Sequence, residues 1–351
     1  MSLSNEAFKP SIKIAINKKQ KREILVVKKK ISNKEFKYEK LKECPTCESS
    51  QKTKISEYDR YGFPYKSNLC KGCGLIYTSP RFNQESYIKF YNENYRNIYS
   101  ERGTKEKFYQ NQVVKGIKVF NFLSKHIDLE RIKNVLEVGS GMGGILAPFK
   151  EKGKQVLGVD YGSEYVNYGN GKGINSTVGG IKTIKKTKYD LIIYCHVFEH
   201  ILDLDNELNE IKKRLSKRGV LYIEVPGIKA LGENYRNDLN RYLQNAHTYN
   251  FSLITLCNVL NKNRFKLKFG NERVESIFVY SDKPQETVNE YKRILNRLNN
   301  YAAINIKYLM SIKYVKQIII ALLRKIKLYG LIESLRNFLI IYNFSNLKKR
   351  G

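Results

Sequence analysis

The chain has 351 residues, of which 42% are hydrophobic and 12% aromatic, enough apolar material for a buried core and for about two domains. This composition excludes an intrinsically disordered chain. The 64 Lys and Arg residues exceed the 33 Asp and Glu residues, and the formal net charge of +31 predicts anionic partners.

Much of this charge lies at the two ends of the sequence. Residues 1–43 contain 13 basic and 5 acidic residues, and residues 301–351 contain 10 basic residues and 1 acidic residue. The part between them has the modest basic balance of an ordinary soluble enzyme, so charge alone does not indicate a nucleic-acid-binding protein. We expect residues 1–43 to form a basic N-terminal arm that is either mobile or contains one weak strand pair.

The sequence shows neither a targeting segment nor a membrane span. Its first residues lack the continuous apolar core and the small-residue cleavage site of a secretion signal. The most apolar stretch, residues 317–342, is interrupted by charged side chains and never reaches the roughly 18 uncharged residues that a transmembrane helix needs. We therefore expect a cytoplasmic protein that is not an integral membrane protein.

Four of the six cysteines form two Cys-x-x-Cys pairs, Cys44 with Cys47 and Cys70 with Cys73. The 22 residues between the pairs suit the spacing with which two tight turns present four thiolates to one tetrahedral Zn²⁺. Four sulfur ligands would complete the coordination shell, so such a metal would be structural rather than catalytic. We predict a zinc-binding ribbon over residues 44–80; the alternatives are unpaired structural thiols or a redox pair.

The pattern changes after the cysteines. Residues 85–130 have helical periodicity, and from residue 134 strands and helices alternate, which is typical of a parallel sheet with helices on both faces. The predicted strands are residues 134–138, 155–160, 176–178, 189–197 and 219–226, followed by an antiparallel hairpin of residues 265–269 and 276–280. The predicted helices between them include residues 144–152 and 203–216.

A glycine loop follows the first of these strands, with glycines at Gly139, Gly141 and Gly143. Glycines allow a sharp turn and let a ligand approach the backbone, and the start of the next helix favours negative charge. Asp160 ends the second strand, 19 residues after Gly141, where a carboxylate can accept hydrogen bonds from both ribose hydroxyls. These features predict a nucleoside-binding half-domain.

The glycines also satisfy the Gly-x-Gly-x-x-Gly spacing of dinucleotide-binding proteins, through Gly139, Gly141 and Gly144. Glu137 argues against a dinucleotide, because its carboxylate would repel a pyrophosphate but could serve the cationic sulfonium or amino group of S-adenosylmethionine. Polar side chains, His196 among them, follow the central strand beside the ligand crevice. The sheet also ends in a hairpin and not in another parallel strand–helix–strand unit. We therefore favour S-adenosylmethionine as the ligand.

Four segments carry a resemblance to a known family: LEVGSGMGG, LGVD, YDLIIYCHVFEHILD and LSKRGVLYIEVPG. They are similar to the strand-end motifs of the class I S-adenosylmethionine-dependent methyltransferases. With the cysteine pairs in front, the chain looks like a bacterial subgroup with an N-terminal zinc ribbon, which includes sugar C-methyltransferases and enzymes encoded with surface-polysaccharide genes. The segment from His247 to Ser252 is similar to a His-x-x-x-Phe-Ser segment common there.

This resemblance implies a doubly wound, mostly parallel, seven-stranded α/β sheet of the Rossmann-like methyltransferase type, with the small zinc ribbon before it and a helical extension after it. It implies that S-adenosylmethionine is bound by Glu137, Gly139, Ser140, Gly141, Gly143, Asp160, Tyr161 and His196. The sequence departs from the family's pattern at Gly179 and Gly180, where many relatives keep an acid near the adenine. Residues 285–351 also do not resemble the C-terminal domain of the sugar C-methyltransferases.

Polar residues after two of the predicted strands are candidates for catalysis: His196, Glu199, His200 and His247. Methyl transfer needs an acceptor with an available lone pair or carbanion, and a neutral histidine is suited to remove its proton. The alternative is that Glu199 and His200 cap the following helix, while His247 holds a loop.

Residues 285–351 predict a basic amphipathic helical extension. Apolar residues recur at helical spacing along one stripe: Ile312, Val315, Ile319, Leu322 and Ile326. Basic residues surround this stripe: Lys313, Lys316, Arg324, Lys325 and Lys327. A second apolar face continues through Leu331, Leu335, Phe338, Leu339 and Tyr342. Such helices pack on their own domain, pair with another chain, or lie on an anionic membrane surface.

The predicted domains are the basic arm (1–43), the zinc-binding ribbon (44–80), a class I methyltransferase domain with N-terminal helices (81–284) and the helical extension (285–351). We predict an S-adenosylmethionine-dependent methyltransferase that acts on a small or lipid- or nucleotide-linked anionic acceptor, a sugar in surface-glycan biosynthesis. Its C-terminal helices would contact the inner membrane face peripherally. The alternatives are an RNA methyltransferase and a scaffold that binds S-adenosylmethionine without turnover.

Overall fold

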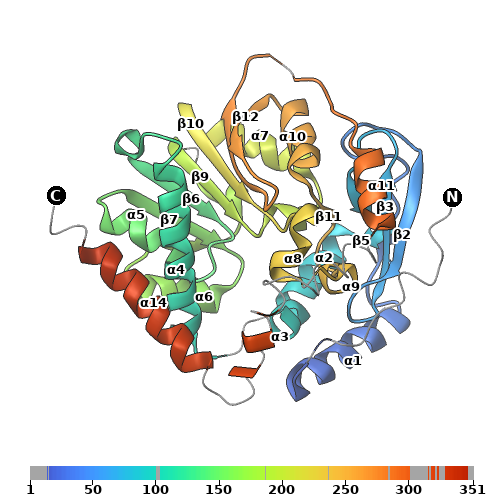
Figure 1. The fold of residues 1–351 in the computed structure, drawn as a ribbon, viewed down its shortest axis with the longest axis horizontal. Helices are drawn as coiled ribbons and strands as arrows, with labels where there is room; N and C mark the ends of the chain where they lie inside the picture. Colours follow the sequence, from blue (N-terminus) through green and yellow to red (C-terminus); the bar gives the residue numbers. More distant parts are fainter. Residues whose placement is uncertain are drawn as a thin grey trace.

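The computed structural model describes residues 14, 16–99, 103–185, 187–235, 237–283, 285–300, 315, 318–320, 322, 323 and 329–346. Within this part of the chain, a seven-stranded sheet and a four-stranded sheet lie beside each other, with helices around them (Figure 1). A further pair of very short strands, β1 (Tyr38–Glu39) and β5 (Arg81–Phe82), is antiparallel.

The large sheet has the strand order β12-β13-β10-β9-β6-β7-β8. From β8 to β10 the neighbouring strands are parallel, whereas β13 is antiparallel to both β10 and β12. The strands are β6 (Asn134–Val138), β7 (Gln155–Asp160), β8 (Ser176–Val178), β9 (Tyr189–Cys195), β10 (Leu215–Glu224), β12 (Phe265–Gly270) and β13 (Glu275–Tyr280). The predicted seven-stranded sheet with its closing hairpin is confirmed.

Alternate residues of the central strands face opposite sides of this sheet. Leu136 packs into the core on one side and Val135 into the core on the other, as the two-residue period of a strand requires. The helices on the first side are α7 (Leu204–Arg214) and α10 (Leu253–Lys262). Those on the second side are α4 (Lys105–Ser124) and α5 (Ala147–Glu151), with the 3₁₀ turn η3 (Gly144–Leu146). Burial on both faces explains why β9 is apolar almost throughout.

Shorter helices surround the carboxyl ends of the parallel strands. They are α2 (Gln84–Phe90), the π-helical turn η1 (Tyr91–Tyr95), α3 (Arg96–Tyr99), α6 (Ser163–Gly171), α8 (Leu231–Asn234) and α9 (Leu239–Tyr242). The segment from α2 to α3 belongs to the predicted helical region 85–130. It contacts Asp160 at the end of β7 and His200, which follows β9. This segment therefore forms one wall of the crevice above the sheet.

The four-stranded sheet contains the cysteine pairs and has the order β11-β4-β3-β2. Its strands are β2 (Lys52–Tyr58), β3 (Pro64–Cys70), β4 (Ile76–Thr78) and β11 (Tyr249–Asn250). The strand β11 comes from the methyltransferase-like region and pairs with β4 in antiparallel register, Tyr249 opposite Tyr77. Cysteine-bearing turns and large-sheet residues also share one core. The ribbon is therefore built into the rest of the molecule.

The N-terminal region differs from the expectation of a mobile arm or a strand pair, because most of its described part forms a helix, α1 (Lys18–Ser32), and its short strand β1 pairs with β5 outside the region. Asn17 caps this helix by accepting a hydrogen bond from the Gln20 backbone at 2.7 Å, and the Gln20 side chain accepts one from Asn17 in return. Ile24 and Val27 lie in a core with residues of α2 and α3. The strand-like alternation in this segment was therefore misleading; one helical face is buried.

Two helices are described in the C-terminal extension, α11 (Tyr291–Asn299) and α14 (Tyr329–Asn346). Figure 1 shows α11 beside the strands of the small sheet and α14 beside α4, on the opposite side of the molecule. Seven residues of the predicted apolar stripe and of the basic residues around it lie outside the described residues: Ile312, Lys313, Lys316, Arg324, Lys325, Ile326 and Lys327. Among the described helices, none has the length and the apolar run that crossing a membrane requires.

Candidate functional site

The glycine loop leaves β6 in a conformation that requires glycine. Gly139, Gly141 and Gly143 have φ angles of 71°, 56° and 73°, in the left-handed region. A Cβ atom added to Gly139 would lie 2.3 Å from Cγ2 of Val197, which follows the central strand β9. The loop therefore approaches the end of β9 closely, and both border the same crevice at the carboxyl edge of the sheet.

Asp160, at the end of β7, connects this loop to two other segments. Its Oδ2 accepts a hydrogen bond from the Gly141 backbone at 2.9 Å, and its Oδ1 accepts one from Gly162 at 2.7 Å. The guanidinium of Arg96, on α3, also donates to Oδ1 at 2.7 Å. The contact of Asp160 with ribose hydroxyls stays a prediction, and Arg96 is a site residue that sequence reasoning missed.

Gln112, on α4, braces the loop from the other side and was also missed. Its side-chain oxygen accepts a hydrogen bond from the Met142 backbone at 3.1 Å, and its amide nitrogen donates to the Ser140 carbonyl oxygen at 3.1 Å. The one signal in the sequence is a polar residue beside the apolar positions of a helix. That signal does not tell which backbone groups the side chain will meet.

The remaining predicted cofactor residues lie at different depths. Glu137 is 1% exposed, and burial together with the charge of Asp160 raises its pKa well above the ordinary value. The side chain of Ser140 is fully buried against Gly158, so within the loop only the backbone of Ser140 can face a ligand. Tyr161, in contrast, is 73% exposed. Their contacts with a cofactor stay predictions.

The four predicted catalytic residues lie together on the other side of the crevice. His196 follows β9 with a φ of 57°, Glu199 and His200 lie in the 3₁₀ turn η5 (Phe198–His200), and His247 precedes β11. Oε1 of Glu199 is 3.7 Å from Nδ1 of His196, and 3.8 Å from Nε2 of His200 and of His247. The fourth histidine, His126, lies elsewhere and stacks on a phenylalanine ring with centroids 3.5 Å apart.

The alternative role of Glu199 and His200 as helix caps was wrong. Asp203 is the N-cap residue of α7, and its carboxylate accepts a hydrogen bond from the Asn206 backbone at 3.0 Å. His247 does take part in holding its loop, because its carbonyl oxygen accepts a hydrogen bond from the Tyr65 hydroxyl at 2.9 Å. Its ring nevertheless faces Glu199, so the two roles of His247 are compatible.

Neighbouring charges divide the histidines into two kinds. Burial lowers the pKa of His196, but the carboxylates of Glu199 and Glu224 outweigh this effect and raise its pKa to about 9. Burial lowers the pKa of His200, and it lowers that of His247 well below the ordinary value. At neutral pH the cluster therefore combines one cationic and two neutral imidazoles.

Glu224, at the end of β10, was not predicted from the sequence. It lies 3.5 Å from Nε2 of His196 and forms an ion pair with Lys115 of α4. Burial raises the pKa of Glu224, but His196 and Lys115 hold it far below the ordinary value. The residue thus places a permanent negative charge beside His196.

A ladder of tyrosines borders the histidine cluster along α2, η1 and α3. Tyr91 and Tyr95 stack with centroids 4.3 Å apart, and Tyr99 continues the row at 4.9 Å. The Tyr91 hydroxyl lies 2.6 Å from Nδ1 of His200. The guanidinium of Arg60 lies 5.2 Å from the Tyr99 ring, and its Nε is buried without a hydrogen-bond partner. Aromatic faces and a positive charge thus meet beside the candidate base.

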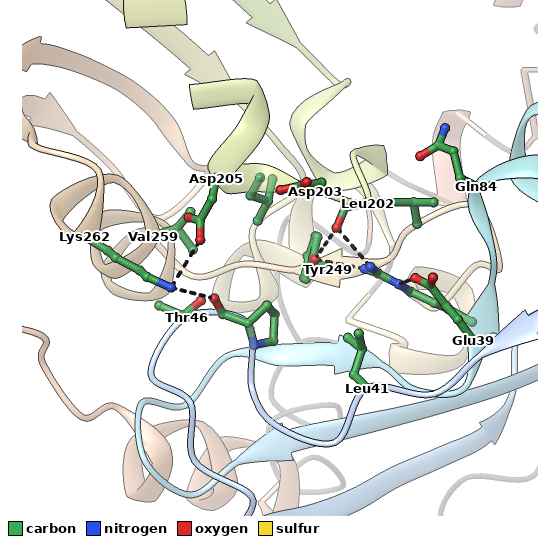
Figure 2. Close-up of a pocket in the computed structure, with 13 residues that line it drawn as sticks. Glu39, Leu41, Thr46, Gln84, Leu202, Asp203, Asp205, Tyr249, Val259 and Lys262 are labelled. Atoms are coloured by element: carbon green, nitrogen blue, oxygen red, sulfur yellow. Dashed lines mark hydrogen bonds and ion pairs between the residues drawn. The ribbon is translucent and has the colours of Figure 1, made fainter. Parts of the chain in front are cut away.

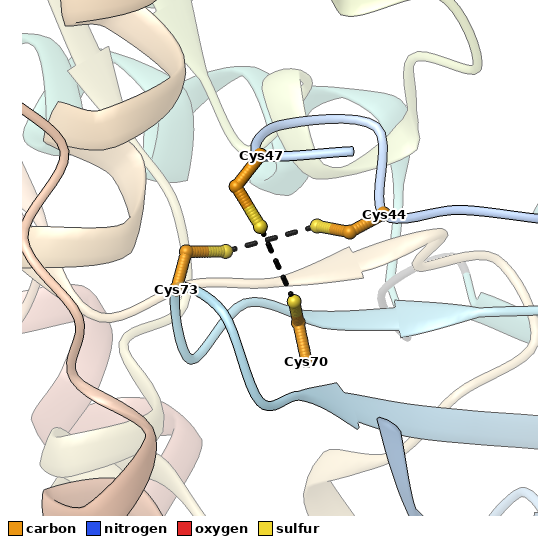
Figure 3. A group of neighbouring side chains, drawn as sticks. All are labelled: Cys44, Cys47, Cys70 and Cys73. Atoms are coloured by element: carbon orange, nitrogen blue, oxygen red, sulfur yellow. Dashed lines mark hydrogen bonds between the residues drawn. The ribbon is translucent and has the colours of Figure 1, made fainter. Parts of the chain in front are cut away.

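The four cysteines of the two pairs converge at one point, as Figure 3 shows. The Sγ atoms of Cys44 and Cys73 are 3.7 Å apart and those of Cys47 and Cys70 are 3.4 Å apart, too far for disulfides. Zn–S bonds of about 2.3 Å place tetrahedral sulfurs about 3.8 Å apart, so the donor set and its spacing fit a zinc ion. The metal itself stays a prediction.

A cavity of about 370 Å³ lies between the ribbon and the large sheet (Figure 2). Its charged side chains pair with one another: Arg81 donates to Glu39 at 2.7 Å, and Lys262 lies 3.2 Å from Asp205. None of its lining residues belongs to the glycine loop or the histidine cluster. The cavity is thus part of the contact between ribbon and sheet, apart from the candidate site.

Comparison with known proteins adds an independent line of evidence. Residues 108–267 match the family model described as a methyltransferase domain. The chain is 25% identical over 213 residues to the C-methyltransferase NovU of Streptomyces niveus, covering 58% of this chain and 47% of that protein. It is 30% identical over 114 residues to the ubiquinone biosynthesis O-methyltransferase of Pelagibacter ubique (strain HTCC1062), covering 30% and 47%. The chain thus spans about half the length of these curated relatives.

Two solved structures are among those to which the chain is similar. One is a SAM-dependent methyltransferase from Archaeoglobus fulgidus, at 20% identity and a TM-score of 0.38, covering 62% of this chain and 93% of that one. The other is human N-acetylserotonin methyltransferase, at 16% identity and a TM-score of 0.43, covering 56% and 62%. The family match covers 160 of the chain's 351 residues, and strands β6 to β10 of the large sheet lie within it.

Proposed function

We propose that the chain transfers a methyl group from S-adenosylmethionine to a sugar, free or linked to an anionic carrier, in surface-glycan biosynthesis. The observation that carries the proposal is that two groups of residues, or half-sites, meet at the carboxyl edge of the large sheet, where Gly139 lies against Val197. The glycine loop with Asp160 lies on one side, and the histidine cluster around Glu199 lies on the other. The match to a C-methyltransferase supports the same reaction class.

The residues of the first half-site suit the cofactor. The loop leaves its backbone open to a ligand, Asp160 can bind ribose hydroxyls, and the buried carboxyl of Glu137 can balance a cationic amino or sulfonium group. When bound, S-adenosylmethionine supplies an electrophilic methyl group and leaves as a thioether. Tyr161 is exposed and offers a ring on which an adenine can stack.

The second half-site suits the removal of a proton from the acceptor. The neutral imidazole of His200 or His247 would take that proton, and the lone pair left on the acceptor would form the bond to the methyl carbon. Glu199 would stabilise the imidazolium that results, because its carboxylate lies 3.8 Å from both rings. His196, cationic between Glu199 and Glu224, would orient the acceptor from the open side.

The tyrosine ladder and Arg60 support a sugar with an anionic carrier. Sugar rings present C–H faces that pack on aromatic rings, and Tyr95 and Tyr99 are partly exposed beside His200. The unpartnered Nε of Arg60 offers a buried hydrogen-bond donor for a phosphate oxygen. This arrangement favours a nucleotide- or lipid-linked sugar.

The direct test is transfer of a labelled methyl group to a panel of nucleoside-diphosphate sugars. The wild-type chain should label a sugar, and the double variant His200→Gln, His247→Gln should lose at least about a hundredfold in rate while still binding S-adenosylhomocysteine. Labelling of RNA instead would contradict the sugar proposal. Binding of S-adenosylhomocysteine without transfer to any acceptor would favour a non-catalytic scaffold.

Two further parts of the proposal concern the ribbon and the extension. We propose that Zn²⁺ bound by Cys44, Cys47, Cys70 and Cys73 holds the ribbon together.

We also propose that α14 lies on the inner face of the membrane. Leu331, Leu335 and Phe338 on its outer face are 69%, 64% and 63% exposed, and the basic surplus of residues 301–351 suits anionic lipids.

A further inference from the structure

Three of the chain's four histidines surround one buried carboxylate. Glu199 is 1% exposed, and neither of its carboxylate oxygens has a hydrogen-bond partner among the described residues. A buried carboxylate without hydrogen bonds is costly unless positive charge lies beside it. His196 supplies part of that charge but is shared with Glu224, and a metal ion can supply the rest.

The contacts of two rings indicate which of their nitrogens hold lone pairs. Nδ1 of His200 lies 2.8 Å from the carbonyl oxygen of Ala246, which can only accept, and 2.6 Å from the Tyr91 hydroxyl, which can accept as well, so in the neutral ring a proton on Nδ1 serves both contacts and Nε2 holds the lone pair. Nε2 of His247 accepts a hydrogen bond from the side-chain amide of Gln244, so it also holds a lone pair, which a metal ion would take over from that amide. These two nitrogens and a carboxylate oxygen of Glu199 therefore converge without a proton between them.

We propose that Glu199, His200 and His247 bind a divalent first-row transition-metal ion. Two imidazoles and one carboxylate suit such ions and leave coordination positions open. Their donor atoms lie within 4.8 Å of one another, whereas ligands about 2.1 Å from a metal are about 3 to 3.5 Å apart, so shifts of less than about 1 Å would close the site. The contact of His200 with a backbone carbonyl is also the kind that orients a metal-binding histidine.

His196 lies on the open side of this site, with its Nδ1 3.7 Å from the Glu199 oxygen. Its side chain is 49% exposed, whereas those of Glu199 and His247 are buried, so the ion would be reached from the crevice. An ion there would occupy the lone pairs of His200 and His247 and take their place in activating the acceptor, by binding its oxygen and easing the loss of its proton. This last role rests on the proposed function, but the binding of the metal does not.

The test uses the full chain, stripped of metal with a chelator and titrated with Co²⁺ alone. Cobalt bound to thiolates has an intense charge-transfer absorption that cobalt bound to imidazole and carboxylate lacks, so the cysteine site is counted separately. We expect about two ions per chain, one with and one without this absorption. A wild-type chain that binds no thiolate-free cobalt would overturn the proposal.

Variants locate the second ion. Glu199→Gln and His247→Gln should bind the thiolate-free cobalt at least about tenfold more weakly and keep the thiolate-bound ion. His126→Gln is the matched control, because its ring lies on a phenylalanine away from the cluster. Unchanged binding by both cluster variants would also overturn the proposal, and a misfolded variant leaves the wild-type titration decisive. A chain that binds both ions but methylates no acceptor would contradict the proposed function alone.

Discussion

Asp160 shows how much of the candidate cofactor site depends on one side chain. Its carboxylate holds the backbone of Gly141 and of Gly162 and pairs with Arg96, so the loop, the start of α6 and α3 are fixed relative to one another. Glycines permit the shape of the loop, but they do not hold it. The carboxylate does, through charge-assisted hydrogen bonds.

Replacing Asp160 by Ala should weaken the binding of S-adenosylhomocysteine about tenfold or more, because charge-assisted hydrogen bonds to the ligand and to the loop are lost. Isothermal titration calorimetry measures this change. Glu164→Ala is the matched control, since Glu164 is an exposed acid of the neighbouring helix α6 that pairs with Lys105. Equal affinities for wild type and Asp160→Ala would contradict the assigned role.

Glu137 should make cofactor binding depend on pH. Burial raises its pKa well above the ordinary value, so in the free protein the carboxyl becomes neutral as the pH falls through this raised pKa. A cationic amino group binds the ionised form better, so the affinity for S-adenosylhomocysteine should increase with rising pH in the range above the ordinary pKa of a glutamate. Calorimetry across this range tests it, and Glu137→Gln should bind more weakly at the upper end and lose the dependence.

Among the elements, the ribbon has an influence beyond its own residues. The strand β11, which completes the small sheet, begins two residues after His247. The Tyr65 hydroxyl of the ribbon also holds the His247 carbonyl oxygen. The position of a candidate catalytic ring therefore depends on the folded state of the ribbon.

Loss of a cysteine ligand should therefore affect both stability and activity. Cys70→Ser should remove zinc from the ribbon and lower the free energy of unfolding by about 4 kcal/mol or more. Elemental analysis and thermal unfolding measure the two effects. Cys257→Ser is the control, because this partly buried cysteine of α10 lies outside the cluster and should change stability little. Full zinc content in Cys70→Ser would contradict the four-cysteine site.

The helix α14 presents two different faces. One packs on α4, where the Phe344 and Phe120 rings are 5.5 Å apart and Lys107 lies 3.3 Å from Glu333. The other exposes Leu335 and Phe338 to solvent. Packing on the chain's own domain thus accounts for one apolar face of the helix, and the exposed face is available to a lipid surface.

Vesicle co-sedimentation tests this surface. The double variant Leu335→Glu, Phe338→Glu should bind vesicles containing phosphatidylglycerol at least about tenfold more weakly, because it loses apolar burial and gains negative charge. Lys217→Glu is the control, since it changes the net charge by the same amount at an exposed position of β10, far along the chain from α14. Equal binding by wild type and the double variant would contradict membrane contact through α14.

At the scale of the whole molecule, the two sheets enclose a shared core, and the candidate site lies where the segments connecting them meet. Helical residues 84–99 reach from His200 to Asp160, and so contact both half-sites. The same segment packs against α1, so the basic N-terminal region supports one wall of the crevice.

The sequence by itself determined the features whose signals are local. The seven strands of the large sheet, the glycine loop and the cysteine pairs were predicted because apolar period, glycine position and ligand spacing are each set within a few residues. The helix α1 was missed because short alternating stretches resemble strands until one helical face is buried.

Only the tertiary structure decided which distant residues share the site. Arg96, Gln112, Lys115 and Glu224 act through partners 28 to 109 residues away, and no local pattern records such contacts. The convergence of His200 and His247 on Glu199 likewise depends on β11 joining the ribbon. Local sequence specifies elements, but the relative placement of those elements arises from packing over the whole chain, and it is this placement that creates the chemistry of the site.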